Sequence, residues 1–503
     1  MATLIRIRLL TAMLCFIIIT KASAQHFNPV VPDNIADPSI VMFNHTFYLY
    51  GTTDVNHGLS MAGPPVVWKS TDFVNWSFAG TLINGIDWKK AYTYTDSKGA
   101  AKTGYFRYWA PGKVLQKEGK YYLFVTIVKP DETNGTYVLT ANKPEGPFNF
   151  TNGKGLYFNQ PDSIQYDAHP VAPDIDGDPF VDDDGSAYLF WRRRKAAKLS
   201  DDWLSLAGKP INVPTGHDGY SEGPLMFKRN GIYYYLYTLS GSANYCYGYM
   251  MSRKGPLGPF EAPPAGQDIV IQSNLDAGVW GTGHGNVLHL PGTDDYIFVY
   301  LEFVEGSTTR QVFANRIHFN ADGTIQPVKA DLNGVGYIGK NSQKHVNRAA
   351  TAKATASSSK ADRIVNARIE TNPAAIKNVN GSRFTGPTVK AVSRTFTYQP
   401  RNVTDANNGT RWVAAADDQS PWLMLDLGKI QKIKTCEMYF SLPSMGQTWM
   451  LEKSADGTTW HTVKSQGTMV MASPQVANNI GKARYLRLHI LKGMAGLWEM
   501  KVY

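Results

Sequence analysis

The segment Ile232-Tyr-Tyr-Tyr-Leu-Tyr237 decides the fold, because segments of the same kind occur five times before residue 305. Each is a short run of aromatic and aliphatic residues, a composition that favours strands, and most follow a Gly, Asn or Asp at a turn. The other four are Thr46-Phe-Tyr-Leu-Tyr50, Lys120-Tyr-Tyr-Leu-Phe-Val125, Ser186-Ala-Tyr-Leu-Phe-Trp191 and Asp295-Tyr-Ile-Phe-Val-Tyr300. Repetition at intervals of about 45–70 residues is typical of folds built from successive similar units.

A short polar element containing Pro or Gly lies nine to twelve residues before each aromatic segment. These elements are Asp37-Pro38, Trp109-Ala110-Pro111, Asp176-Gly177, Glu222-Gly223-Pro224 and Gly283-His284-Gly285. Such units predict a five-bladed β-propeller, in which the innermost strand of every blade begins near the central axis. The five elements are then expected to converge on one pocket. In the alternative fold, a large β-sandwich, they would only be turn residues.

Length and composition agree with an all-β protein. The chain has 503 residues, more than the about 250–300 at which single cores stop growing, so two domains are expected. The 43% hydrophobic and 18% charged residues exclude disorder for most of the chain. The 61 aromatic residues, 45 Gly and 28 Pro favour short strands and tight turns over helices.

Residues 1–24 have the pattern of a signal peptide: Arg6 and Arg8, an apolar run over 9–20, then Ala22-Ser23-Ala24. Cleavage after Ala24 is predicted, and with it a secreted or periplasmic protein. No later apolar run reaches the about 20 residues needed to span a bilayer, so membrane insertion is not expected.

Charge divides the mature chain into an acidic body and a basic appendage. Without the signal peptide the formal charge falls from +10 to +7; residues 340–503 hold 23 Lys and Arg against 10 Asp and Glu, which leaves −6 for residues 25–339. The basic residues are dispersed rather than clustered, so no nucleic-acid partner is expected. Only Cys246 and Cys436 survive processing, so no disulfide framework is predicted. A monomer is expected.

Composition also predicts the domain limits. The propeller is expected over residues 25–340, and a stretch rich in Ala, Lys and Ser over 341–360 is interpreted as a linker or as the entrance to the next domain. Residues 361–503 are expected to form a small β-sandwich, because Trp422-Leu-Met-Leu-Asp-Leu427 and Arg484-Tyr-Leu-Arg-Leu488 alternate like strands.

The blade openings resemble glycoside hydrolase family 43. The motifs that carry the resemblance occur in that family's order over residues 30–325: Asn34-Ile-Ala-Asp37-Pro-Ser, Tyr108-Trp-Ala-Pro111, Ile175-Asp176-Gly-Asp-Pro-Phe-Val-Asp-Asp-Asp-Gly185, Ser221-Glu222-Gly-Pro and Gly283-His284-Gly. Five ordered motifs are specific where a single one would be weak. The resemblance implies a five-bladed propeller that hydrolyses arabinose- or xylose-containing glycans.

The chemistry of that reaction agrees with the residues. Glycoside hydrolysis needs one carboxylate that activates water and one carboxylic acid that protonates the departing oxygen. By resemblance Asp37 is the general base, Glu222 the general acid and Asp176 the third acid, which raises the pKa of Glu222 and orients it. Asp174 and Asp178 compete for the role of Asp176, and Asp178, which precedes a Pro as Asp37 does, is the closer rival. Each acid alone could instead be a solvated turn residue.

The resemblance assigns three further residues to the pocket. His284 is similar to the family's axial histidine, which often binds calcium directly or through water. Arg310 matches an arginine whose guanidinium can donate to sugar hydroxyls, with a surface salt bridge as the alternative. Trp109 is expected to wall the pocket, or else to wedge between blades. The run over residues 182–184 is interpreted as a solvent-facing turn.

The appendage resembles the discoidin or coagulation-factor type C fold, which carbohydrate-binding modules of family 32 share. The similar stretches are Asn402-Val-Thr-Asp405-Ala-Asn-Asn-Gly409-Thr-Arg-Trp412, Pro421-Trp-Leu-Met-Leu-Asp-Leu-Gly428 and Ser454-Ala-Asp-Gly457-Thr-Thr-Trp460. The resemblance implies a jelly-roll β-sandwich that binds carbohydrate. The alternative is a domain that only packs against the propeller.

Together these features predict an exported, inverting, exo-acting α-L-arabinofuranosidase that acts on plant polysaccharide side chains. A β-xylosidase or a β-D-galactofuranosidase on the same scaffold stays open, because all three would use the same carboxylates. A non-catalytic propeller lectin is the alternative of another class. The chemistry requires no cofactor, and calcium is expected at most in a structural role.

Overall fold

The computed structural model describes residues 26–54, 65–81, 83, 86, 88, 90–159, 167–217, 220–264, 266–303, 309–339, 346–371 and 388–503. The predicted signal peptide and residues 341–345 of the predicted linker lie outside these ranges. Within them, the structure has no helix with the length and apolar character needed to cross a bilayer.

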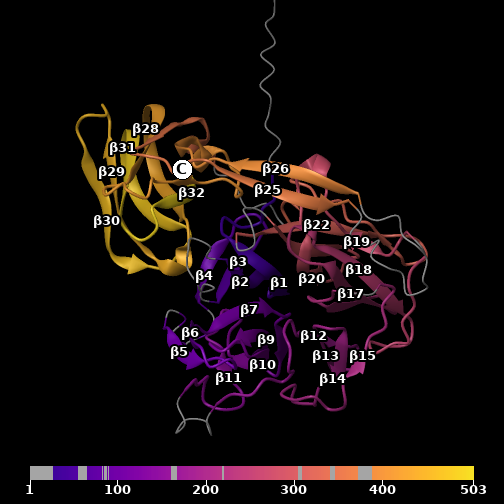
Figure 1. Ribbon diagram of the computed structural model, residues 1–503. Helices are drawn as coiled ribbons and strands as arrows, with labels where there is room; N and C mark the ends of the chain where they lie inside the picture. Colours follow the sequence, from indigo (N-terminus) through magenta and orange to yellow (C-terminus); the bar gives the residue numbers. More distant parts are fainter. Residues whose placement is uncertain are drawn as a thin grey trace, which may run out of the picture.

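Five antiparallel sheets form a five-bladed propeller (Figure 1), which confirms the predicted fold class. The innermost strands are β1 (Ile35–Phe43), β7 (Arg107–Pro111), β12 (Asp178–Val181), β16 (Leu225–Arg229) and β20 (Gly283–His289). The five aromatic segments supply the second strands, β2 (Thr46–Thr53), β9 (Lys120–Val128), β13 (Ala187–Trp191), β17 (Ile232–Ser240) and β21 (Tyr296–Glu302).

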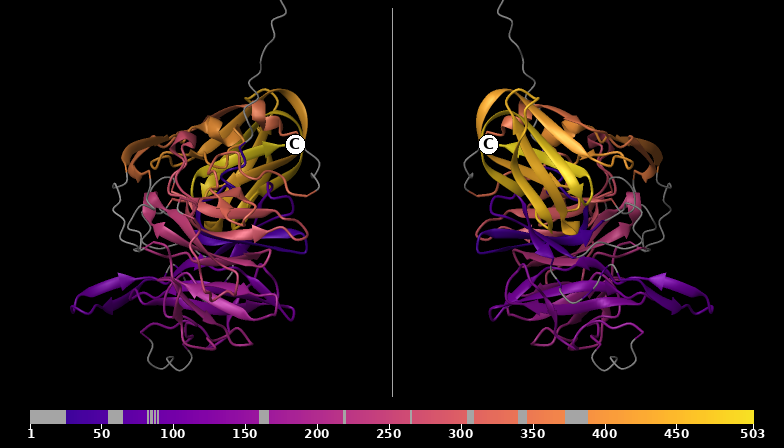
Figure 2. Two further views of the ribbon diagram at one scale, coloured as in Figure 1. Left: turned by 90° about the vertical axis from the view of Figure 1, so that its right-hand side faces the viewer. Right: turned by 90° about the vertical axis from the view of Figure 1, so that its left-hand side faces the viewer.

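Each sheet continues outward through a third and a fourth strand. The third strands are β3 (Val66–Ser70), β10 (Asn134–Ala141), β14 (Lys195–Lys198), β18 (Cys246–Ser252) and β22 (Gln311–Phe319). The outermost are β4 (Ser77–Thr81), β11 (Asn149–Phe150), β15 (Ile211–Asn212), β19 (Ile269–Ile271) and β23 (Ile325–Gln326). Blade 2 also contains β8 (Leu115–Lys117), and the hairpin of β5 (Tyr92–Thr95) and β6 (Ala101–Gly104) projects from the propeller (Figure 2).

The aromatic strands hold neighbouring blades together because alternate side chains of a strand point to opposite faces of the sheet. In β17, Tyr234 packs in a cluster with Phe298 of blade 5, whereas Tyr235 packs in a cluster with Phe190 of blade 3. One strand therefore fills both inter-blade cores, which explains why its sequence is aromatic almost throughout.

The C-terminal domain is built on one seven-stranded sheet with the order β27-β32-β28-β31-β29-β30 and with β24 paired to β28. Its core contains the buried rings of Trp412 and Trp449. The limits predicted at residues 340 and 360 stay predictions. The strands are β24 (Lys353–Ala356), β27 (Trp412–Val413), β28 (Trp422–Phe440), β29 (Gln447–Ser454), β30 (His461–Val470), β31 (Gln475–Lys492) and β32 (Gly496–Val502).

Several parts of this domain pack against the propeller, among them the Ser473 carbonyl oxygen, which accepts from the Phe78 N–H in β4 at 2.7 Å. In the loop before β27, the Asn408 side chain donates to the Pro29 carbonyl oxygen at 3.0 Å, and Arg411 donates to Asn34 Oδ1 at 3.4 Å. A separate hairpin of β25 (Arg363–Glu370) and β26 (Val389–Phe396) reaches from the sandwich across the propeller (Figures 1 and 2). The short 3-10 helices are η2 (Ser242–Asn244), η3 (Leu275–Ala277), η4 (Arg348–Thr351), η6 (Pro400–Thr404) and η7 (Pro443–Met445).

Candidate active site

The blade openings converge at the propeller axis as predicted, and three of them are carboxylic acids in buried positions. Asp37, Asp176 and Glu222 are 6%, 5% and 8% exposed. Asp37 and Asp176 adopt left-handed backbone conformations with φ of 49° and 65°, as does His284 with φ of 29°. Such conformations cost non-glycine residues about 1–3 kcal/mol each and occur most often at functional sites.

A threonine hydroxyl fixes each of the three acidic residues. Thr52 donates to Asp37 Oδ2 at 2.7 Å and accepts from the Ala110 N–H at 2.8 Å. Thr126 accepts from the Asp176 N–H, and Thr238 accepts from the Glu222 N–H, both at 2.8 Å. These threonines follow the aromatic segments of blades 1, 2 and 4 and occupy the same position in each, six residues after the segment begins. Sequence reasoning missed them, although this shared position was visible in the repeats.

Asp37 lies between two cations. Arg310 Nη1 is 3.3 Å and His284 Nδ1 is 3.4 Å from Asp37 Oδ1. Burial raises the pKa of Asp37, but Arg310 and His284 more than offset this effect, so its pKa lies below the usual value. The carboxylates raise the pKa of His284 in turn, against the opposite effect of burial. Asp37 is therefore ionised and close to positive charge.

Asp176 has the opposite surroundings. Its Oδ2 accepts from the Gly223 N–H at 3.1 Å. Burial, followed by the negative charges of Glu222 and Asp37, raises the pKa of Asp176 to about 7 although His284 lowers it. Asp176 therefore carries a proton in a large fraction of molecules at neutral pH.

Two tyrosines surround the carboxyl group of Glu222. Tyr245 donates a hydrogen bond to Glu222 Oε1, and the Tyr220 hydroxyl interacts with both Glu222 and Tyr245. Burial and the Glu222 charge raise the pKa of both phenols, so they stay protonated donors. Tyr220 is 47% exposed and presents its ring to solvent beside the acid. Sequence reasoning missed both tyrosines, because neither belongs to a blade-opening motif.

The rival acids have structural partners. Asp178 Oδ1 accepts from the Lys113 N–H at 2.9 Å and from the Asn286 side chain at 3.0 Å, which joins blades 2, 3 and 5. Asp174 forms ion pairs with Arg192 and Arg193 at 2.8 and 3.4 Å. In the 182–184 turn, residues 183 and 184 are exposed and residue 182 is partly buried. Asp176 differs from these rivals because the Glu222 charge contributes to its raised pKa.

The Arg310 side chain is 15% exposed and pairs with two buried carboxylates, Asp37 and Asp54. Its Nε and Nη2 donate to the two Asp54 oxygens at 2.8 and 3.0 Å, and its Nη1 donates to Asp37 at 3.3 Å. A guanidinium has five N–H groups, so two are left for a sugar. Asp54, a residue that sequence reasoning did not select, therefore holds Arg310 against Asp37.

Trp109 lies in β7 next to Ala110, whose N–H donates to Thr52. Its ring is partly buried, and the Arg107 guanidinium lies 4.8 Å from the ring centre. The structure places Trp109 one residue from the network that holds Asp37, with part of the ring accessible to a ligand.

His284 borders a central cavity of about 10 Å³, which has room for about one water molecule. Asp178 and Asn286 also line the cavity, and one side-chain oxygen of each is buried without a partner. Calcium takes about six to eight oxygen ligands, and among the residues that the structure describes no three His, Cys, Asp or Glu side chains are grouped to hold a metal ion. The lining has room for one buried water, and calcium near His284 stays a prediction.

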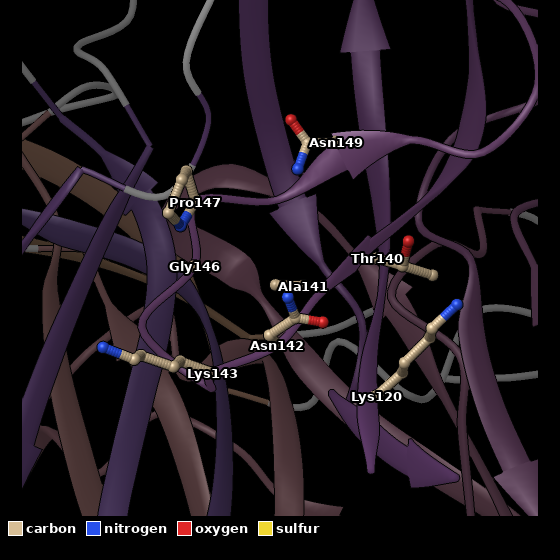
Figure 3. A pocket seen from close by; sticks show the side chains of 8 residues that line it. All are labelled: Lys120, Thr140, Ala141, Asn142, Lys143, Gly146, Pro147 and Asn149. Carbon is tan, nitrogen blue, oxygen red and sulfur yellow. The ribbon is translucent and has the colours of Figure 1, made fainter. Parts of the chain in front are cut away.

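A larger hollow of about 390 Å³ lies over blade 2 (Figure 3). It contains no carboxylate and none of the blade-opening residues, so it is not the site of the chemistry described above. Its lining residues are Lys120, Thr140, Ala141, Asn142, Lys143, Gly146, Pro147 and Asn149.

Converging buried carboxylic acids at the axis of a propeller, one ionised and one with a raised pKa, are the groups that a glycoside hydrolase needs. The pattern of Glycosyl hydrolases family 43 matches residues 27–325, and that of the F5/8 type C domain matches residues 388–500. The chain belongs to glycosyl hydrolase family 43, which confirms the predicted enzyme class and both resemblances.

Similar proteins carry several substrate names. The chain is 30% identical over 325 residues to the β-D-galactofuranosidase xynD of Aspergillus niger. The aligned region covers 63% of this chain and 88% of that protein. It is 27% identical to the arabinoxylan arabinofuranohydrolase of Bacillus subtilis, over 62% of this chain and 66% of the relative. A solved structure described as a glycoside hydrolase is 40% identical, with a TM-score of 0.79 over 95% of this chain and 100% of that chain.

Proposed function

We propose that this glycosidase is an exported, inverting, exo-acting enzyme that removes α-L-arabinofuranosyl side chains from a plant-type polysaccharide. The observation that carries the proposal is the contrast between the acidic residues: Asp37 lies between Arg310 and His284, whereas Asp176 and Glu222 lie together. A carboxylate kept ionised suits a general base, and a carboxyl beside a second buried acid suits a proton donor.

In the proposed mechanism Asp37 accepts a proton from water while the water oxygen attacks the anomeric carbon. The bond to the leaving oxygen breaks, and Glu222 gives its proton to that oxygen. Attack from the face opposite the leaving group inverts the anomeric configuration. Asp176, which lies beside Glu222, is the third acid and is proposed to orient Glu222 for this transfer.

The sugar-binding wall is proposed to include Trp109, Arg310 and His284. The accessible part of the Trp109 ring can stack on a sugar face, and Arg310 has two N–H groups left for sugar hydroxyls. His284, beside Asp37, can meet the same sugar unit. These roles stay predictions until a ligand complex is available.

The choice of arabinofuranose is supported by the relatives' names, which include the Bacillus subtilis arabinofuranohydrolase and a non-reducing end α-L-arabinofuranosidase of Bacteroides ovatus. A β-D-galactofuranosidase is the second candidate, favoured by the 30% identity to the Aspergillus niger enzyme, and a β-xylosidase the third. Turnover of nitrophenyl α-L-arabinofuranoside, β-D-galactofuranoside and β-D-xyloside tests the proposal. We expect the arabinofuranoside to be hydrolysed fastest; faster turnover of another would reassign the sugar.

The proposal extends to the cellular setting. A leader cleaved after Ala24 would deliver a secreted or periplasmic monomer that acts on polysaccharide, without a nucleic-acid partner or membrane insertion. N-terminal sequencing and light scattering of the exported protein test this. The chemistry uses no cofactor, so EDTA is expected to leave kcat/KM unchanged, whereas a lower thermal midpoint in EDTA would support structural calcium near His284.

A further inference from the structure

The β25–β26 hairpin of the C-terminal domain contacts the propeller beside the proposed general acid. The Glu370 N–H in β25 donates to Asn244 Oδ1 at 2.9 Å. Asn244 is the last residue of η2, and the next residue is Tyr245, which donates to Glu222 Oε1. Only one peptide bond separates the residue that the hairpin binds from the residue that orients the Glu222 carboxyl.

A second contact of the hairpin is an ion pair between the partly buried Arg394 and the buried Glu302. Arg394 in β26 donates to Glu302 Oε1 at 2.7 Å and to Oε2 at 3.3 Å, and it also donates to the Gly278 carbonyl oxygen. Glu302, at the end of β21, is 1% exposed, and its Oε1 accepts from the Trp280 N–H at 3.2 Å. The Arg394 guanidinium also lies 4.5 Å from the Trp280 ring centre. Arg394 therefore fixes the backbone that leads into β20.

The segment that Arg394 fixes is the one on which Tyr245 rests. Gly281 lies against η2, since a Cβ there would be 3.0 Å from the Ser242 carbonyl oxygen. Gly283 lies under Tyr245, since a Cβ there would be 2.2 Å from the Tyr245 Cβ. The hairpin thus contacts both segments that hold Tyr245 in place. It binds η2 through Asn244, and it binds the segment leading into β20 through Arg394.

We infer that the β25–β26 hairpin is a positioning element of the active site: Arg394 and the Glu370 backbone hold Tyr245 so that its hydroxyl orients Glu222 for proton transfer. The inference rests on the proposed role of Glu222 as general acid. The C-terminal domain then contributes to the chemical step as well as to any binding of glycan.

Arg394→Met is the direct test, made in the full chain. We expect kcat on an alkyl α-L-arabinofuranoside to fall by about 10-fold, part of the ~10²–10⁴-fold that a positioned acid supplies, and to fall much less on the dinitrophenyl glycoside, whose leaving group needs no proton. An equal loss on both substrates, or no loss, would overturn the inference.

A double-mutant cycle identifies the route. Tyr245→Phe removes the hydroxyl that meets Glu222, so Arg394→Met should cost little more in that background; an undiminished cost would contradict positioning through Tyr245. Arg484→Met is the matched control, because it removes a bidentate ion pair between Arg484 and Asp426 that lies within the C-terminal domain, away from the hairpin. We expect that control to keep the wild-type kcat on both substrates.

Further measurements distinguish a failure of the inference from misfolding of the variant and from an error in the proposed function. Asn244→Ala removes the other contact and leaves the ion pair, and it should reproduce the leaving-group pattern of Arg394→Met. Hydrogen exchange at residues 242–245 should be faster in Arg394→Met than in wild type, with or without turnover; unchanged exchange would overturn the inference. Failure of the wild type to hydrolyse any of the aryl glycosides would instead refute the proposed function.

Discussion

Two blade-opening carboxyl groups near the propeller axis, Asp37 and Asp176, are similarly buried but have opposite electrostatic surroundings. Asp37 lies beside Arg310 and His284, and its pKa falls below the usual value. Asp176 lies beside Glu222, and its pKa rises to about 7. Burial alone would raise both. The difference teaches that in this site neighbouring charges, rather than depth, decide which carboxyl is a base at neutral pH.

The blades supply a common support, and flanking residues supply the charge. Asp37, Asp176 and Glu222 are each fixed by a threonine from an aromatic strand. The Asp37 side differs because Asp54 presents Arg310 to it. A repeated fold thereby produces unlike carboxyl groups at equivalent positions.

The largest effect is expected from Asp37→Asn. The amide has nearly the shape of the carboxylate but cannot accept a proton from water, so kcat should fall by at least the ~10²–10⁴-fold that a positioned base supplies. Thermal unfolding and arabinose binding should stay close to wild type. If more than about a tenth of the activity survived, Asp37 would not be the base.

Arg310→Met should raise the pKa of Asp37 toward the raised pKa of Asp176. Without the guanidinium the pKa of Asp37 rises, so the acidic limb of the kcat/KM profile should shift to higher pH. Leaving Asp37 and Asp54 buried without their partner should also cost about 3–5 kcal/mol of unfolding free energy. Arg229→Met removes a two-pronged pair with Asp294 on the surface and should leave the limb in place. If the acidic limb did not shift in Arg310→Met, Arg310 would not be what lowers the pKa of Asp37.

Asp176→Asn should act in the other direction. Above about pH 7 wild-type Asp176 is ionised, and the variant lacks this negative charge beside Glu222, so the alkaline limb of the pH profile should shift to lower pH. The loss of activity should be similar on good and poor leaving groups, because Asp176 itself donates no proton. A limb that stayed in place would mean that the two carboxyls do not interact.

Asp176→Asn is also expected to be more stable than wild type by an amount that grows with pH. The pKa of Asp176 is about 7 in the folded protein against an ordinary value of 3.8, so the folded state binds more protons between these values and wild-type stability falls as pH rises through this window. Asp176→Asn removes that loss. Its thermal midpoint should exceed that of wild type above pH 7 by more than at pH 4; equal differences at both pH values would contradict the raised pKa.

Thr52→Val should have the smallest effect on activity. It removes the hydrogen bond to Asp37 and leaves the Ala110 N–H without its acceptor, which should cost about 1–3 kcal/mol in denaturant unfolding with a smaller fall in kcat than Asp37→Asn. Thr93→Val, on the exposed face of β5, is the control and should change neither quantity. A stability equal to wild type would mean that the threonine is not part of the support.

The sequence predicted the residues that local motifs mark and missed those that depend on distant contacts. The aromatic segments and the blade openings were sufficient for the five blades and for Asp37, Asp176 and Glu222. Tyr245 carries no motif, and its position depends on glycines almost 40 residues away. The β25–β26 hairpin lies before the discoidin-like stretches, which begin at Asn402, so its docking on the propeller could not be predicted from local pattern.

The leaving-group dependence of Glu222→Ala is the sharpest test of whether Glu222 donates the proton opposite the ionised Asp37. On an alkyl or sugar glycoside the departing oxygen needs a proton, so this variant should lose much of the ~10²–10⁴-fold due to acid catalysis. A dinitrophenolate departs as a stable anion, so on that substrate the loss should be far smaller and the alkaline limb should disappear. An equal loss on both substrates would contradict this role and would make Glu222 a binding or structural carboxylate.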